Sequence, residues 1–294
     1  MINTKDIIAQ VRRIEIRTRR IVDDITAGAY HSVFKGRGIE FEEVREYTPE
    51  DDVRDIDWNV TARMGSPFIK KYIEERELTV MLAIDASAST AFGSKNKSKN
   101  EHAIEIASLL AFSAIRNNDK VGLFIFTDKN ELYLPPRSGK THGLRLIREL
   151  IARKPKEKGT DIAAGLNNLM HLLNKRAVIF LISDFMDDKD FSKRLMIANK
   201  RHDVVAVRIL DPAEIKWPGT STISLEDSEN GKTLELFIPG KIFSDGFTKR
   251  AASIQHTNET VCKRAKVDLI DIRCGEDFVK PLVKFFRQRE NLHR

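Results

Sequence analysis

The stretch Leu78-Thr79-Val80-Met81-Leu82-Ala83-Ile84-Asp85-Ala86-Ser87-Ala88-Ser89 decides the fold class. Its first seven residues form a largely apolar run that is typical of a buried strand. The run ends on a carboxylate, and two serine hydroxyls follow it at alternating positions. Mg²⁺ prefers hard oxygen ligands of this kind. The stretch therefore predicts a divalent-cation site at the end of a strand, and the alternative is an Asp- and Ser-rich turn that binds only its own backbone.

Two later segments favour the metal site. Gly159-Thr160-Asp161 opens a helical pattern, and Ile182-Ser183-Asp184 closes the apolar run 177–181. Taken singly, each segment could be an ordinary helix cap or turn. Ligands of open α/β sheets bind at the carboxyl edge of the strands, where all three loops are expected. Three loops with oxygen donors in this order therefore indicate one shared site.

At these positions the chain resembles a von Willebrand factor A-like domain. That family carries a metal-ion-dependent adhesion site, written D-x-S-x-S, then Thr, then Asp, on three successive loops. The matching residues here are Asp85, Ser87, Ser89, Thr160 and Asp184. The resemblance implies that the hydroxyls approach Mg²⁺ or Mn²⁺ directly and that the aspartates act directly or through water. It also implies that one coordination position stays open for a carboxylate of a partner.

From residue 77 onward, strand and helix patterns alternate. The expected strands are 78–84, 121–127, 177–182, 204–210 and 267–273, and the expected helices are 100–117, 141–153, 161–174, 189–200, 241–264 and 276–290. This alternation predicts an α/β domain over 77–294 with a mostly parallel sheet. Strands that are apolar almost throughout fit a sheet flanked by helices on both faces. The segment 211–239 interrupts the order, and its Asn230-Gly231 pair predicts a hairpin insertion.

Residues 1–76 are expected to form an N-terminal amphipathic helix and a small β-rich unit. The helix, over 5–26, should dock with its basic face in solvent; contact with a membrane or nucleic acid is the alternative. Short strands are expected around 39–44 and 68–73. The interleaved charges Arg45, Asp52, Arg54 and Asp57 should pair with one another or with the backbone. Trp58 should be a buried anchor, because it shares one face of an extended stretch with Ile56.

Composition bounds the class of protein. The chain has 294 residues, 41% of them hydrophobic, and a formal net charge of +7. No apolar run approaches the roughly 20 residues of a membrane helix, and the first residues lack the apolar core of a secretory signal. We therefore expect a cytoplasmic protein with no integral membrane segment. Cys262 and Cys274 should be free, buried thiols, and Ser138-Gly139-Lys140-Thr141 is no P-loop because Leu134 replaces its first glycine.

The polar N-terminal segment narrows the resemblance. Its marks are Gly36-Arg37-Gly38-Ile39-Glu40-Phe41, Arg45-Glu46-Tyr47, Asp51-Asp52-Val53-Arg54-Asp55-Ile56-Asp57-Trp58, Ala62-Arg63 and Glu75-Arg76-Glu77. With D-x-S-x-S, these are similar to bacterial domain-of-unknown-function family fifty-eight, from near Phe34 to residues 285–289. Glu50 and Thr90 depart from that pattern, where Gly and Met are usual. The resemblance implies chaperone-like assembly with a MoxR-type AAA ATPase or with other von Willebrand A-like proteins.

Three classes of function are compatible with these features. The leading hypothesis is a non-enzymatic, metal-dependent module that binds an acidic residue of a protein partner. A basic nucleic-acid-binding protein is the first alternative, but the positive charge is spread along the chain without an aromatic-and-basic motif. A Mg²⁺-dependent phosphoryl hydrolase is the second. Ser87 stands where a D-x-D-x-T phosphatase carries its second aspartate, which argues against that chemistry.

Overall fold

The structure is a computed structural model that describes residues 11–15, 39–49, 51–74, 78–153, 155, 157–216, 222–226, 233–237 and 240–292. The chain divides into a small unit, Phe34–Leu78, and a large unit that holds Thr79–Arg294. Helical residues 11–15 group with the large unit, whereas the sequence placed them with the small one. Ile14 is buried, and Glu15 pairs with Lys140 at 2.8 Å. The rest of the expected helix 5–26 lies outside the described residues.

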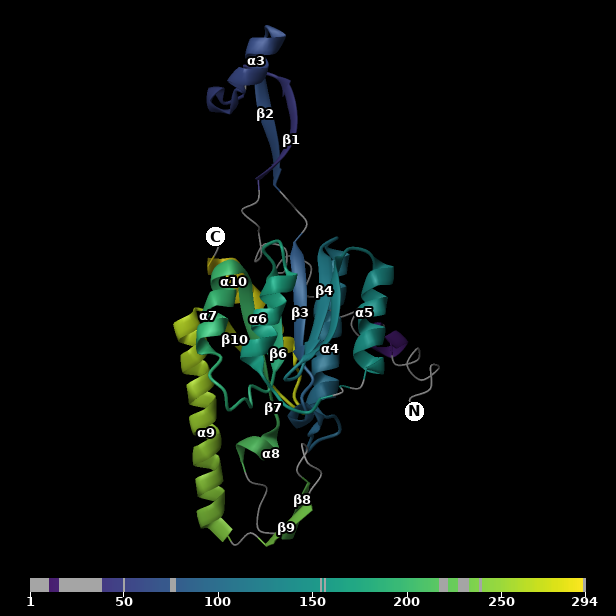
Figure 1. Cartoon of the computed structure of the whole chain (residues 1–294), viewed down its shortest axis with the longest axis vertical. Coiled ribbons are helices and arrows are strands. Elements are labelled where there is room, and N and C mark those ends of the chain that lie inside the picture. Colours follow the sequence, from purple (N-terminus) through teal and green to yellow (C-terminus); the bar gives the residue numbers. More distant parts are fainter. Residues whose placement is uncertain are drawn as a thin grey trace. The chain divides into compact units, whose positions relative to one another are not determined.

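The large unit is built on a six-stranded sheet of order β10-β7-β6-β3-β4-β5 (Figure 1). The strands are β3 (Thr79–Asp85), β4 (Lys120–Phe126), β5 (Asn130–Arg137), β6 (Val178–Ser183), β7 (Asp203–Leu210) and β10 (Asp268–Arg273). Neighbouring strands run parallel except β5, which pairs antiparallel with β4. β3 lies between β4 and β6, so its last residue ends at the middle of the carboxyl edge.

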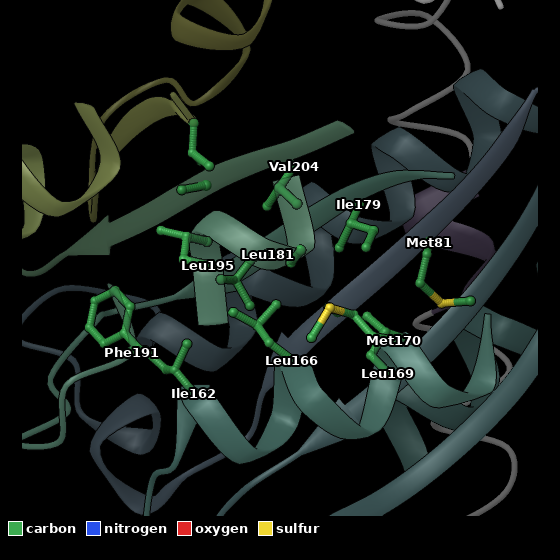
Figure 2. Close-up of a cluster of buried hydrophobic side chains, with 14 of the residues drawn as sticks. Met81, Ile162, Leu166, Leu169, Met170, Ile179, Leu181, Phe191, Leu195 and Val204 are labelled. Carbon is green, nitrogen blue, oxygen red and sulfur yellow. The ribbon is translucent and has the colours of Figure 1, made fainter. Parts of the chain in front are cut away.

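Helices cover both faces of this sheet (Figure 1). They are α4 (Lys99–Arg116), α5 (Lys140–Ala152), α6 (Ile162–Leu172), α7 (Ser192–Arg201), α9 (Gly240–Ala265) and α10 (Val279–Leu292). The short helix α8 (Pro212–Ile215) follows β7 and contacts α9. Side chains of β3, β4 and β6 pack with α6, α7 and α9 in the core cluster of Figure 2, which includes Met81, Leu166, Leu181 and Leu195. On the other face, Phe180 of β6 meets Phe286 of α10 edge to face. The α/β class and its mostly parallel, helix-flanked sheet are confirmed.

The predicted strands and helices of this unit all form, and β5 is the strand that the sequence did not indicate. Pro135 and Pro136 lie within it, and proline reads as a breaker because it cannot donate to a sheet ladder. An edge strand tolerates it, since one side of an edge strand needs no donors. The predicted hairpin insertion also forms, from β8 (Thr222–Glu226) and β9 (Thr233–Phe237) in antiparallel register. Its turn, Asn230-Gly231, lies outside the described residues.

The small unit contains an antiparallel pair, β1 (Ile39–Glu46) and β2 (Phe68–Glu74), with a 3₁₀ turn and helix α3 (Trp58–Met64) between them. Three of the four charges named in the prediction, Arg45, Asp52 and Asp57, bind partners within this unit. Arg45 donates two bonds to Asp51, at 2.6 and 2.9 Å, and lowers the pKa of that carboxyl to about 2. Asp52 accepts a hydrogen bond from the backbone N–H of Arg54, and Asp57 caps the start of α3.

The predicted burial of Trp58 is wrong, because this residue is 67% exposed. Asp57 accepts hydrogen bonds from the backbone N–H groups of Asn59 and Val60, so a helix begins at Trp58. The extended stretch that would have put Trp58 beside Ile56 therefore ends before the tryptophan.

Two further expectations concern the whole chain. Cys262 and Cys274 are free and buried, as predicted. Within the described part of the chain, every helix is too short or too polar to cross a membrane.

Candidate metal centre

Asp85 is the last residue of β3 and is 1% exposed. Its Oδ1 atom accepts a hydrogen bond from the backbone N–H of Ser87 at 2.9 Å, which turns the chain sharply after the strand. Its Oδ2 atom accepts a hydrogen bond from Ser183 Oγ, in neighbouring β6, at 2.6 Å. Burial raises the pKa of Asp85 to about 6, and repulsion from the nearby Asp184 carboxylate adds to the rise. Two hydrogen bonds thus hold the carboxylate in place, in a buried environment that disfavours its ionised form.

The two serine hydroxyls lie side by side after this turn. Ser87 Oγ and Ser89 Oγ are 3.1 Å apart. They lie on the loop 86–91, called the serine loop below, in which Ser87 precedes a short 3₁₀ helix, Ala88–Ala91. Thr90 Oγ1 donates a hydrogen bond to the carbonyl of Ser87 at 2.7 Å and stabilises this loop. Octahedral Mg²⁺ has ligands at about 2.0–2.1 Å, which puts adjacent ligand atoms about 3 Å apart. The spacing of the two hydroxyls fits that requirement.

Asp184 follows β6 directly and is also buried. Its Oδ1 atom accepts from the backbone N–H of Met186 at 3.1 Å. Its Oδ2 atom accepts from the ammonium group of Lys99, at the start of α4, at 2.7 Å. The chain turns here through Phe185, whose φ of 56° lies in the left-handed region. Asp184 is therefore placed beside Asp85 on the adjacent strand, with both of its oxygens already accepting a bond.

Thr160 lies on the loop that leads into α6 and is half-buried. The backbone N–H of Ala88 donates to the carbonyl of Lys158 at 2.9 Å, which joins this loop to the serine loop. Asp161, not Thr160, caps α6, by accepting from the N–H of Ala164 at 2.7 Å. The cap interpretation therefore holds for Asp161 and leaves the Thr160 hydroxyl without a capping role.

The five predicted residues thus come from three loops at one edge of the sheet. Hydrogen bonds tie Asp85, Ser87 and Ser89 together, and Asp184 interacts electrostatically with Asp85. Among the described residues, the Thr160 hydroxyl makes no hydrogen bond to the other four; only its loop is joined to theirs. Whether the five bind a metal together stays a prediction at this point.

Three further residues at this edge, Ser183, Lys99 and Glu214, were not predicted as site residues. Ser183 orients Asp85, as described above, and it also accepts the backbone N–H of Phe185 at 2.9 Å. Lys99 is 0% exposed and bridges Asp184 to Glu214 of α8, with Nζ 2.6 Å from Glu214 Oε1. Burial alone would lower the pKa of Lys99, but the two carboxylates outweigh burial and raise it. No local sequence signal marks a lysine in the first turn of a helix as buried.

The chemistry of the donors suits a hard cation. The site offers three neutral hydroxyls and two carboxylates, an all-oxygen set of the kind that Mg²⁺ and Mn²⁺ take. Within the described ranges, no group of three or more His, Cys, Asp or Glu side chains is arranged to hold a metal. Five oxygen donors, three of them hydroxyls, suit a hard cation and not a soft metal.

A cavity of about 440 Å³ adjoins the serine loop, and Ser87 is part of its lining. Ile84, Ile125 and Leu150 give it apolar walls, and Arg153, Glu157 and Lys158 also line it. The cavity has room for a side chain beside Ser87.

Comparison with known proteins identifies the family. The model of the family described as "Protein of unknown function DUF58" matches residues 43–257. The chain belongs to this family. Two uncharacterized proteins, from Mycobacterium bovis and Mycobacterium tuberculosis, are each 28% identical to this chain over 290 residues, which cover 98% of this chain and 91% of theirs. The predicted DUF58 membership is confirmed.

Solved structures align with this DUF58 chain at low sequence identity. The conserved hypothetical protein BatB from Bacteroides thetaiotaomicron aligns with a TM-score of 0.48 at 16% identity, covering 73% of this chain and 99% of BatB. The SpRpn10 VWA domain aligns with a TM-score of 0.39 at 13% identity, covering 71% and 95%.

Proposed function

We propose that this DUF58 protein is a metal-dependent protein-interaction module. Asp85, Ser87, Ser89, Thr160 and Asp184 would hold one Mg²⁺ or Mn²⁺ ion. When bound, the ion supplies a positive charge and an open coordination position for a partner's carboxylate. The observation that carries the proposal is the 3.1 Å spacing of the Ser87 and Ser89 hydroxyls beside the buried Asp85 carboxylate.

The protein's own residues prepare this site before any partner arrives. Asp85 holds the serine loop through the N–H of Ser87, and Ser183 holds Asp85. Three of the five donors are neutral hydroxyls, and the Asp184 carboxylate is already paired with the Lys99 ammonium group, so the donors leave part of a bound cation's charge to be neutralised. A partner carboxylate would complete the neutralisation, which makes partner binding and metal binding mutually reinforcing.

The adjoining cavity supports an interaction role. Its apolar walls, from Ile84, Ile125 and Leu150, would accept an aliphatic side chain next to the partner's acidic residue. The partner would therefore present an acidic residue with an apolar neighbour. The family resemblance suggests a MoxR-type AAA ATPase, or another von Willebrand A-like protein, as that partner.

The same geometry argues for binding and against turnover. A hydrolase needs a general base within hydrogen-bond reach of the attacking water. Asp85 already accepts two hydrogen bonds, and Asp184 is paired with Lys99. Both carboxylates are thus already engaged in holding the loops, which argues against either of them acting as a general base. We propose that the protein is not an enzyme.

Calorimetric titration with Mn²⁺ tests the metal site. Wild type should bind weakly, and Asp85→Ala and Ser87→Ala should each abolish binding. Asp188→Ala is the matched control, because it removes an exposed aspartate four residues from Asp184 and should bind like wild type. Equal binding by wild type and Asp85→Ala would overturn the proposal.

A second experiment tests the partner. The purified wild type, used as bait in a native lysate, should retain an AAA ATPase with Mg²⁺ present and release it in EDTA. Asp85→Ala should fail to retain the ATPase under both conditions. Equal retention of an ATPase by the variant and by wild type would place the interaction elsewhere on the protein.

A further inference from the structure

Lys99 brings a fixed positive charge to the proposed metal site. We infer that its ammonium group is a built-in counter-cation, which holds Asp184 in the metal-free protein and keeps the affinity of the site for divalent cations low. This inference rests on the proposed function, since it concerns the same site. It assigns Lys99 and Glu214 as residues that set metal affinity without binding the metal.

The geometry leaves little freedom to this lysine. Its Nζ atom lies 2.7 Å from Asp184 Oδ2 and 2.6 Å from Glu214 Oε1. The side chains of Lys99 and Asp184 are each 1% exposed, whereas that of Glu214 is 22% exposed. The ammonium group is thus buried between Asp184, a proposed metal ligand, and the carboxylate of Glu214.

Local helix energetics do not explain a lysine at this position. Ser98 and Glu101 form a capping box, so Lys99 is the first residue of α4. A cation at a helix N-terminus is disfavoured by the helix dipole, and burying an ammonium group adds a desolvation penalty. Asp184 and Glu214 must offset both penalties. The lysine is therefore held there by these carboxylates and not by its own helix.

The balance of charge gives the effect on metal affinity. With all four groups ionised, Asp85, Asp184 and Glu214 contribute three negative charges and Lys99 one positive charge. A divalent ion that approaches Asp184 meets the ammonium group on the same carboxylate. At an effective dielectric constant of about 20, repulsion between cations a few ångströms apart exceeds the free energy of a tenfold change in affinity.

Three variants separate this role from a purely structural one. Lys99→Met removes the positive charge, Glu214→Gln removes one negative charge from a partly exposed position, and the double variant removes one of each. Calorimetry with Mn²⁺ should show binding at least about tenfold tighter for Lys99→Met and weaker for Glu214→Gln. The double variant should return close to the wild-type affinity.

Thermal unfolding with and without Mn²⁺ supplies the second readout. Lys99→Met should melt below wild type in EDTA, because Asp184 and Glu214 lose their counter-charge, and Mn²⁺ should restore much of the loss. If Lys99→Met fails to fold, weaker Mn²⁺ binding by Glu214→Gln supports the role and unchanged binding overturns it.

The outcomes also separate this inference from the proposed function. If wild type and all variants bind Mn²⁺ equally, the metal site stands and the role of Lys99 is overturned. If none of the proteins binds Mn²⁺, the proposed function and the role of Lys99 both fall. Binding by Lys99→Met but not by wild type supports the role of Lys99 directly.

Discussion

Ser183 Oγ lies 2.6 Å from Asp85 Oδ2, a hydrogen bond between adjacent strands at the centre of the carboxyl edge. The two residues are 98 positions apart in the chain, and both side chains are buried. The parallel pairing of β3 and β6 places them together. This bond fixes the carboxylate on which the proposed metal site depends.

Ser183→Ala should therefore weaken Mn²⁺ binding several-fold and lower the free energy of unfolding by about 1–3 kcal/mol, since a buried acceptor loses its donor. Ser183→Thr keeps the hydroxyl and is the control. Calorimetry and urea unfolding check both effects. Wild-type Mn²⁺ affinity in Ser183→Ala would show that Asp85 does not need this orientation.

The affinity for Mn²⁺ should depend on pH in the range set by Asp85. The pKa of this carboxyl is raised to about 6, so the group is protonated below that pH and a cation must displace the proton. Binding should be nearly constant from pH 7 to 8 and should weaken up to about tenfold per pH unit below 6. Titrations at pH 5, 6, 7 and 8 measure this, and a flat profile would contradict it.

Stability at acid pH should depend on His202. Burial and the nearby positive charges of Arg201 and Arg176 lower the pKa of this histidine to about 4. His202 binds a proton near pH 6.5 in the unfolded chain but only near pH 4 in the folded protein. Its contribution to the free energy of unfolding is therefore fully present above pH 6.5 and is lost as the pH falls from 6.5 toward 4. The loss amounts to at most about 3 kcal/mol.

His202→Asn should flatten that dependence. His202 Nδ1 accepts the backbone N–H of Ala177 at 3.3 Å, and an asparagine oxygen can replace it without titrating. Urea unfolding at pH 7 and pH 5 should show a smaller difference for the variant than for wild type. An equal difference would assign the acid sensitivity to other groups.

Two glycines in helices should respond oppositely to alanine. A Cβ at Gly165 of α6 would lie 2.7 Å from the Phe126 ring, so Gly165→Ala should cost about 1–3 kcal/mol through overpacking. A Cβ at Gly246 of α9 meets nothing within 4 Å, so Gly246→Ala should add up to about 1 kcal/mol. Thermal melts of the pair test this, and a shift of the same sign in both would refute it.

Trp58→Ala should leave thermal stability nearly unchanged, within about 0.5 kcal/mol, because the side chain is 67% exposed. Fluorescence gives an independent check, since the emission lost on substitution should be that of a solvent-exposed indole. A drop of several kcal/mol would restore the buried anchor that the sequence predicted.

The sequence alone determined the order and type of most elements in the large unit, with β5 and the short α8 as exceptions. Strands such as β6 are buried along their whole length, so a continuous apolar run identified them, and helices followed from their period of apolar residues. These signals are local. Because parallel strands end at a common edge, the same patterns also placed Asp85, Thr160 and Asp184 on neighbouring loops.

Three features depended on the tertiary structure and could not be predicted from local sequence patterns: the strand β5, the exposure of Trp58 and the burial of Lys99. β5 tolerates its two prolines because it lies at the edge of the sheet. Trp58 is exposed because Asp57 caps a helix that begins at the tryptophan. Lys99 and Asp184 are 85 positions apart, and a lysine in the first turn of a helix reads as a solvent-exposed charge. Its burial is favourable only because two carboxylates from distant segments reach it, and that compensation exists only once the sheet and α8 have assembled.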